Sequence, residues 1–264
     1  MDEKLVSVIM PTYNGSRFLA ASIESVLSQT YKHLELLITD DCSSDYNVQR
    51  IIKEYAAKDS RVKPVFLKEN HGVGYSRNNA IERAEGRYIA FCDSDDRWMP
   101  EKLERQLAYM NEKGCALSYS SYILCDENDH EKGIVIAPQK VTYHDMVRDN
   151  KVGCFTAIYD IKKTGRKMYM PIMRKRQDWA FFITLFKQCQ VSYGIQEPMG
   201  YYRMRKNSIS SHKAQLIKYN VQVYRDILGY SKLRAYLSFF CMFMPAYTLK
   251  ITKRQWDSYR YMHS

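Results

Sequence analysis

An acidic turn is the sharpest chemical signal in the chain. Asp93-Ser94-Asp95-Asp96 follows a run of apolar residues that is typical of a buried strand. Hard carboxylate oxygens suit Mg²⁺ or Mn²⁺, and such a cation neutralises the charge that builds up on a leaving diphosphate. The same residues also fit a solvated turn that caps a helix near Pro100, because turns favour Asp and Ser. The segment alone leaves both interpretations open.

Two other polar clusters offer groups for a nucleotide. PTYN, at residues 11–14, places the flat ring of Tyr13 where it can stack on a base. Asp40 and Asp41 follow a second apolar run and can accept hydrogen bonds from a base N–H or a ribose hydroxyl. The plainer interpretations are a tyrosine packed on the edge of a sheet and an ordinary polar turn.

A glycine-containing segment, HGVGYSRNN at residues 71–79, favours phosphate. Gly72 and Gly74 precede the expected start of a helix, and Arg77 lies in its first turn. Exposed backbone N–H groups, the helix dipole and a guanidinium all attract an anion there. GxG alone is a weak signal, and the sequence contains neither the GxGxxG fingerprint nor a Walker loop.

Asp178, in the segment QDWAFF, is the candidate for acid–base chemistry. A carboxylate there could deprotonate an acceptor hydroxyl, although a free Asp has a pKa of about 3.9 and needs desolvation to be an effective base. Arg174, Lys175 and Arg176 lie just upstream and would lower that pKa. They could instead hold a phosphate on the acceptor. The plain alternative for Asp178 is a helix cap beside a buried Trp.

A basic, serine-containing segment, YYRMRKNSISSHK at residues 201–213, is a further candidate. It could fold over the diphosphate of a donor. Its plain alternative is a solvated surface loop.

The elements that must position these residues alternate through the first half of the chain. Strands are expected at residues 5–10, 35–40, 62–67 and 87–92, with helical periodicity between them. This alternation predicts an α/β fold with a largely parallel sheet. Ligands of such sheets bind beyond the carboxyl ends of the strands. The segments that follow the four strands are PTYNG, DDCSSD, ENHGVG and DSDD, so the polar clusters should meet at one edge.

The second half has a looser pattern. It predicts a small helix at residues 142–150 opened by Thr142, a strand at residues 153–160 and a helix at residues 177–188. A strand-like segment and two helices follow.

The charge is concentrated at the C-terminal end. Residues 203–264 contain twelve Lys/Arg and two acids, which gives +10 of the total +11. Such a basic tail suits nucleic acid or an anionic membrane surface. The longest uncharged apolar stretch, residues 235–249, has fifteen residues, whereas a spanning helix needs roughly 20. We therefore expect an interfacial or packed helix.

The cysteines and the N-terminus indicate the compartment. Seven scattered cysteines without CxxC spacing argue against a disulfide framework or a zinc site and fit a reducing cytoplasm. The opening MDEKLVSVIM does not have the form of a signal peptide.

Taken together, the motifs resemble those of the family 2 glycosyltransferases of the GT-A fold. The likeness lies in the order and spacing of VSVIMPTYN, SVLSQTY, LLITDDCSSD, NHGVGYSRNNAIERAEGRYIAFCDSDD and RWMPEKLERQ, with looser matches at QDW and YYRMRKNSIS. The resemblance implies an inverting transfer from a nucleotide-sugar, usually a UDP-sugar, to an acceptor hydroxyl. It also implies a divalent metal, Mn²⁺ or Mg²⁺.

The resemblance also implies roles for particular residues. Asp93 and Asp95 correspond to the family's DxD motif, with Asp95 as the direct metal ligand and Asp93 beside it. Asp178 corresponds to the general base, although the family more often has Glu-Asp where this chain has Gln177-Asp178. The nucleotide-sugar site is expected to comprise Pro11, Tyr13, Asp40, Asp41, Gly72, Arg77, Asp93 and Ser94.

The expected organisation has three parts. Residues 1–110 form the nucleotide-sugar-binding half, residues 111–212 the acceptor-binding and catalytic half, and residues 213–264 a basic helical tail. Relatives that build surface polysaccharides use lipid-linked saccharide acceptors at the inner membrane face. We therefore expect a cytoplasmic enzyme, attached peripherally to an anionic membrane surface by an amphipathic helix at residues 232–250, with no nucleic-acid partner. The alternative for this helix is packing on the body or a dimer contact.

Two other functions remain alternatives. A sugar nucleotidyltransferase would carry a glycine-rich loop after the first strand, where PTYNGSR has one glycine. A non-catalytic nucleotide- or nucleic-acid-binding protein would not need both DSDD and Asp178 in one cleft.

Overall fold

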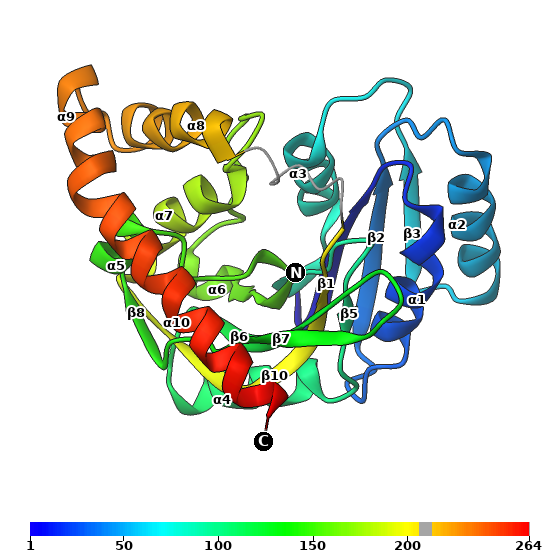
Figure 1. Cartoon of the computed structure of the whole chain (residues 1–264). Helices are drawn as coiled ribbons and strands as arrows, with labels where there is room; N and C mark the ends of the chain where they lie inside the picture. Colours follow the sequence, from blue (N-terminus) through cyan, green and yellow to red (C-terminus); the bar gives the residue numbers. More distant parts are fainter. Residues whose placement is uncertain (206–212, 264) are drawn as a thin grey trace.

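A single mixed sheet runs through the molecule (Figure 1). The computed structural model describes residues 1–205 and 213–263, with the side chains of helix α8 described from residue 217. The strand order is β3-β2-β1-β4-β9-β6-β10-β5, with β7 paired to β6 and β8 paired to β10. The strands are β1 (Asp2–Thr12), β2 (Leu34–Asp40), β3 (Val62–Phe66), β4 (Gly86–Phe91), β5 (Arg97–Trp98), β6 (Leu117–Cys125), β7 (Glu131–Val135), β8 (Lys140–Thr142), β9 (Ile158–Asp160) and β10 (Val191–Arg203).

The first half is the parallel α/β unit that the sequence predicts. β1 pairs in parallel with β2 and β4, and β2 pairs in parallel with β3. Side chains of successive residues in β1 point to opposite faces of the sheet: Val6, Val8 and Met10 belong to one buried cluster, whereas Ile9 belongs to the other. Both faces are buried because helices cover both of them, which is why these strands read as continuous apolar runs.

The second half of the sheet is mixed. β9 lies antiparallel between β4 and β6, and β10 is parallel to β6 but antiparallel to β5 and β8. The strand expected at residues 153–160 is wrong in its first part, where Cys154–Thr156 forms a 3₁₀ turn. Thr156 closes that turn, since its backbone N–H and its hydroxyl both donate to the Gly153 carbonyl. The local side-chain bond therefore overrides the β-favouring composition.

The helices form a layer on each side of the sheet. One buried cluster joins the sheet to α1 (Ser16–Leu27), α2 (Tyr46–Lys58) and α4 (Lys102–Glu112). The other cluster joins it to the remaining helices of the body, which are α3 (Val73–Arg83), α5 (Tyr143–Arg148), α6 (Ile161–Thr164) and α7 (Gln177–Cys189). Thr142 opens α5 with a capping box, as its position predicts.

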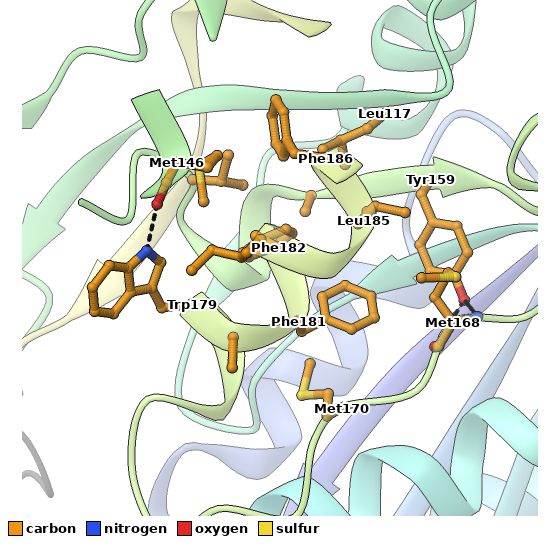
Figure 2. Packing of buried hydrophobic residues seen from close by; sticks show 14 of the residues in the cluster. Leu117, Met146, Tyr159, Met168, Met170, Trp179, Phe181, Phe182, Leu185 and Phe186 are labelled. Atoms are coloured by element: carbon orange, nitrogen blue, oxygen red, sulfur yellow. Dashed lines mark hydrogen bonds between the residues drawn. The ribbon is translucent and has the colours of Figure 1, made fainter. Parts of the chain in front are cut away.

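Helix α7 is the centre of the second core (Figure 2). Phe181, Phe182 and Phe186 are fully buried. Trp179 is also fully buried, and its indole N–H donates to the Met146 carbonyl of α5 at 2.6 Å. The catalytic segment expected at residues 177–182 thus begins on a firmly packed helix.

The C-terminal part is α8 (Lys213–Asp226) followed by one continuous helical rod (Figure 1). The rod comprises α9 (Lys232–Ser238), a π-helical turn η2 (Phe239–Phe243) and α10 (Met244–Met262). Pro245 is the second residue of α10, one residue beyond the π turn, an arrangement that accommodates the N–H that proline lacks. α10 packs along β7, where the Ser258 hydroxyl donates to the Ile134 carbonyl and accepts from its N–H, both at 3.1 Å. Within the described residues, no helix has the length and apolar character to cross a bilayer.

Candidate active site

The carboxyl ends of the parallel strands open onto a cavity of about 760 Å³, a volume typical of small-molecule sites. Both halves of the chain line it. Of the ten residues assigned from the sequence to the nucleotide-sugar, metal and base sites, nine line this cavity: Pro11, Tyr13, Asp41, Gly72, Arg77, Asp93, Ser94, Asp95 and Asp178. Arg174, Lys175 and Arg176, the candidates for an acceptor phosphate, line it as well. The structure therefore brings the four strand-end segments together with α7, although α7 lies more than eighty residues beyond the acidic turn in the chain.

The acidic turn after β4 is held by arginines. Arg77 Nη2 lies 2.5 Å from Asp93 Oδ1, and Arg205 Nε lies 2.9 Å from Asp95 Oδ2. Burial, together with repulsion from Asp93, raises the pKa of Asp95 above its usual range. The turn does not cap a helix, because α4 has Glu101 as its N-cap residue and no side-chain cap bond among the described residues. The interpretation as a plain capping turn is therefore wrong.

Asp96, the last residue of the turn, has a different position from its neighbours. It is buried, and its Oδ1 accepts the backbone N–H of Arg203 at 3.0 Å. This bond ties the acidic turn to the end of β10. Asp96 therefore holds the turn in place, and Asp93 and Asp95 face the cavity.

Asp93 and Asp95 fit a divalent cation by their chemistry. Two carboxylates close enough to repel each other are stabilised by a positive charge, and their hard oxygens suit Mg²⁺ or Mn²⁺. Within the part of the chain that the structure describes, no group of three or more His, Cys, Asp or Glu side chains could hold a metal by itself. A cation here would complete its coordination with diphosphate oxygens and water, as Mg²⁺ commonly does.

Asp40 and Asp41 have separate surroundings. The two carboxylate oxygens of Asp41 accept the backbone N–H groups of His71 and Gly72 at 2.9 and 2.7 Å. Asp40 is buried, does not line the cavity, and accepts the Ser43 hydroxyl at 2.5 Å. Asp41 thus stabilises the loop before α3, whereas Asp40 stabilises the turn that follows β2, on the side away from the cavity.

The N-terminus of α3 points its first turn at the same cavity. Gly72 precedes the helix with a φ of 88°, a left-handed conformation that glycine adopts without strain. Gly72, Ser76 and Arg77 all line the cavity. Burial alone would lower the pKa of Arg77, but the charge of Asp93 outweighs it and, with a smaller contribution from Asp178, raises that pKa. Arg77 is therefore a permanent cation between the acidic turn and α7.

Asp178 lies in the first turn of α7 and faces the cavity. Asn150 Nδ2 donates to its Oδ2 at 3.0 Å. The residue at the N-cap position is Arg176, in a left-handed conformation with φ 67°, and not Asp178. The capping interpretation of Asp178 is therefore wrong, whereas the buried neighbouring Trp is confirmed.

Sequence reasoning missed several residues of the cavity wall. Asn150, Lys151 and Lys250 line it, and no local motif marks them. Arg205 belongs to the basic segment at residues 201–213, of which residues 206–212 lie outside the described residues. Its contact with Asp95 follows from the pairing of β10 with β5 and β6, which no pattern within the segment reveals.

The architecture is that of known GT-A glycosyltransferases. The chain superimposes on Staphylococcus aureus TarS in complex with UDP-GlcNAc with a TM-score of 0.68 and 22% identity, covering 92% of this chain and 74% of that one. It also superimposes on the mannosyltransferase PcManGT from Pyrobaculum calidifontis, in complex with GDP-Man and Mn²⁺, with a TM-score of 0.61 and 14% identity over 96% and 75% of the two chains. These likenesses confirm the α/β GT-A fold.

The chain belongs to glycosyl transferase family 2, whose family model matches residues 7–211. A Bacillus subtilis (strain 168) protein described as a teichuronic acid biosynthesis glycosyltransferase, TuaG, is 41% identical over 84% of this chain and 88% of its own. The Escherichia coli enzyme WfgD, a UDP-Glc:alpha-D-GlcNAc-diphosphoundecaprenol beta-1,3-glucosyltransferase, is 35% identical over 89% and 91% of the two chains. The protein is therefore a glycosyltransferase, and neither the nucleotidyltransferase nor the non-catalytic alternative describes it.

Proposed function

We propose that this glycosyltransferase moves a sugar, with inversion, from a UDP-sugar to a hydroxyl of a lipid-linked saccharide in surface polysaccharide synthesis. The observation that carries the proposal is the position of Asp93 and Asp95 in the same cavity as Asp178. One cavity then holds a site for the leaving diphosphate and a base for the attacking hydroxyl. The printed activity of WfgD supports the choice of donor and acceptor class.

Residues 1–110 would bind the donor in this proposal. Tyr13, half exposed at the cavity rim, would stack on the uracil, with Pro11 beside it, and Asp41 would keep the base pocket closed through its bonds to the 71–72 backbone. The N-terminal end of α3, with Gly72 and Arg77, would face the diphosphate. Ser94 would lie beside it in the acidic turn.

The metal, Mn²⁺ or Mg²⁺, would be held by Asp95 with Asp93 beside it. When bound, it supplies positive charge to the diphosphate as the bond to the sugar breaks. Arg205 and Arg77, which now pair with these carboxylates, would be released to contact phosphate oxygens. PcManGT, whose title names Mn²⁺, supports the choice of metal.

Residues 111–212 would bind the acceptor and carry the base. Asp178 takes the proton of the acceptor hydroxyl while that oxygen forms a bond to the anomeric carbon. The bond from the anomeric carbon to the diphosphate oxygen breaks on the opposite face, so the configuration inverts and UDP leaves. Asn150 fixes the orientation of the Asp178 carboxylate through its 3.0 Å hydrogen bond.

Residues 213–264 would place the enzyme on the inner face of the membrane, where a lipid-linked acceptor is found. The rod α9–α10 buries Ala235, Phe239 and Phe243 against the body and exposes apolar side chains elsewhere. The basic character of this tail adds attraction for anionic lipid.

The test is release of nucleoside diphosphate from a panel of nucleotide-sugars in Mn²⁺, with and without EDTA. We expect slow release from one UDP-sugar, abolished by EDTA and by Asp95→Ala. Asp226→Ala, an exposed carboxylate on α8 outside the cavity, is the matched control and should be unaffected. If calorimetry detects no binding of any UDP-sugar in Mn²⁺, the proposed donor is wrong.

A further inference from the structure

Five cations line the cavity in addition to the arginines that contact the acidic turn. We call them the basic cluster: Lys151, Arg174, Lys175, Arg176 and Lys250, all of which line the cavity. They come from the loop after α5, the loop before α7, and α10 of the C-terminal rod. Residues so far apart in the chain converge here only in the folded state.

The basic cluster adjoins the proposed base. The side-chain Nδ2 of Asn150 donates a hydrogen bond to Asp178 at 3.0 Å, and its backbone carbonyl accepts one from Lys250 Nζ at 2.5 Å. Lys250 and Lys151 also lie 3.1 and 3.4 Å from the carboxylate of Asp149. Asn150 therefore links the carboxylate of Asp178 to one cation of the cluster, Lys250.

The positive charge of the cluster exceeds the negative charge that contacts it. Asp149 is the acid paired with its lysines, and among the described residues neither Arg174 nor Arg176 forms an ion pair. Lys175 instead lies 5.7 Å from the centroid of the Tyr219 ring. Burial, together with repulsion from Lys151 and Arg176, lowers the pKa of Lys250, against the attraction of Asp149. The cluster is therefore crowded with like charge.

Arg176 shows most plainly that this arrangement serves something other than stability. Its Nε is buried without a hydrogen-bond partner among the described residues. Its backbone has φ 67°, a conformation that costs a non-glycine residue about 1 kcal/mol or more. An unpartnered guanidinium N–H held in a strained conformation within a group of cations is suited to binding an anion.

The diphosphate of the donor already has cations of its own in this proposal. Arg77 and Arg205 form ion pairs with the acidic turn, and among the described residues none of the five cations of the basic cluster does so. The basic cluster instead adjoins the residue that would deprotonate the acceptor, since Lys250 and Asp178 share Asn150 and Arg176 stands two residues before Asp178. A second anion, carried by the acceptor, matches it.

We propose that the basic cluster binds the diphosphate group of a lipid-linked acceptor and so presents the acceptor sugar to Asp178. This inference rests on the proposed function. In a glycosyl diphosphate the phosphates are attached directly to the sugar, so a diphosphate held by the cluster would bring the acceptor sugar to the adjoining Asp178. A guanidinium group can donate two parallel hydrogen bonds to the oxygens of one phosphate, and a lysine adds a compact positive charge. α10, which supplies Lys250, also carries apolar side chains such as Leu249 on its exposed side, where the lipid would continue.

The experiment is calorimetric titration of the full chain with an α-N-acetylglucosaminyl diphosphate carrying a short alkyl tail. The protein is first saturated with UDP and Mn²⁺, so that the donor's diphosphate site is filled. We expect binding that is about tenfold or more weaker in Arg176→Gln and in Lys250→Gln, because each loses a charged hydrogen bond. Lys253→Gln, an exposed lysine on the same helix, is the matched control and should bind normally.

Two further ligands identify the group that is recognised. The uncharged alkyl N-acetylglucosaminide should bind at least tenfold more weakly than the diphosphate, and affinity for UDP should be the same in all variants. Equal binding of the uncharged glycoside, loss of diphosphate binding when UDP is present, or full affinity in both Gln variants would overturn the inference while the proposed function stands. Failure of UDP itself to bind would count against the proposed function, and titration of the free protein with the alkyl diphosphate would still test the cluster.

Discussion

At the scale of single residues, the cavity keeps its carboxylates in distinct surroundings. Asp93 and Asp95, both in the acidic turn, each form an ion pair with an arginine from elsewhere in the chain. Asp178 instead accepts a hydrogen bond from the neutral side-chain amide of Asn150. This difference matches the two tasks that a transferase needs: one site that gathers positive charge around a leaving diphosphate, and one that accepts a proton. The two tasks are separable by mutation.

Replacement of Asp178 by Asn should remove the base and leave the donor site intact. We expect the rate of transfer to fall by about 10² to 10⁴, the usual contribution of general-base catalysis. The dissociation constant for UDP-sugar should stay within about twofold, because Asn retains the size of Asp and can still accept the hydrogen bond from Asn150. Single-turnover transfer and calorimetry measure the two quantities. A transfer rate within a few-fold of the original protein would remove Asp178 from the mechanism.

Lys102 gives a second prediction, about stability and pH. It is fully buried, donates to Gln106 Oε1 at 2.6 Å, and lies 4.2 Å from the centroid of the Trp98 ring. Burial lowers its pKa to about 7, whereas the unfolded chain keeps it near the usual value of about 10.4. Between these values the unfolded state binds the extra proton, so stability should rise with pH, by at most about 1.4 kcal/mol per pH unit from this group.

The check is the free energy of unfolding of the original protein and of Lys102→Met from pH 7 to pH 10. We expect the stability of the original protein to increase relative to that of the variant across this window. Lys58→Met, at an exposed position, should show no such divergence. Parallel curves for the original protein and Lys102→Met would mean that Lys102 remains charged in the folded state.

At the scale of elements, α7 carries the proposed base and also packs against the C-terminal helices. Its first turn carries Asp178, and the next residue, Trp179, packs against Tyr224 of α8 and Phe243 of the C-terminal rod, with ring centroids 5.6 and 5.2 Å away. The C-terminal helices thereby support the wall of the cavity from behind. This packing explains how a tail that is remote in sequence can deliver Lys250 to the site.

Truncation of Trp179 should therefore loosen the C-terminal helices together with α7. We expect Trp179→Ala to lower the free energy of unfolding by about 3–5 kcal/mol, because it leaves a large cavity. Trp179→Phe retains most of the ring but leaves the Met146 carbonyl without its donor, so we expect a loss of about 1–3 kcal/mol. Denaturant unfolding gives both values. Equal losses in the two variants would show that the hydrogen bond, and not the packing, dominates.

At the scale of the whole molecule, charge and exposed apolar surface coincide on one side. The C-terminal rod exposes Leu233, Leu237 and Phe240 at 73%, 55% and 58%, and Lys232 and Arg234 flank them. These apolar residues recur at i, i+4 and i+7, which places them on one face of the helix. In Figure 1 the α9 end of the rod lies on the opposite side of the molecule from α2. A membrane contact through this face would leave the donor half away from the bilayer.

The double variant Leu237→Glu/Phe240→Glu should therefore lose attachment to membranes. We expect the original protein to sediment with vesicles of anionic lipid at low salt, and the double variant to remain in the supernatant. Tyr46→Glu, an exposed aromatic on α2, is the matched control and should sediment normally. High salt should weaken binding by screening the basic residues. No sedimentation of the original protein at low salt would contradict the prediction.

The sequence by itself determined the parallel α/β half and the polar groups at its strand ends. Strand and helix periodicity, and the Asp, Gly and Tyr residues at the strand ends, are local features, and parallel strands bring their carboxyl ends to one edge by geometry alone. For this reason the sequence could place Tyr13, Gly72 and Asp95 in one cavity. The periodicity of residues 177–188 likewise predicts α7 almost to its ends.

The tertiary structure decided the features that depend on contacts between distant segments. Asp40 and Asp41 are adjacent and chemically alike, yet only the path of the chain turns Asp41 to the cavity and Asp40 away from it. Nothing near Lys250 in the sequence predicts its position, because it reaches Asn150 from a hundred residues away, carried by the packing of the C-terminal rod. Local patterns fix which groups stand at the end of an element, whereas burial between elements fixes which of these groups meet.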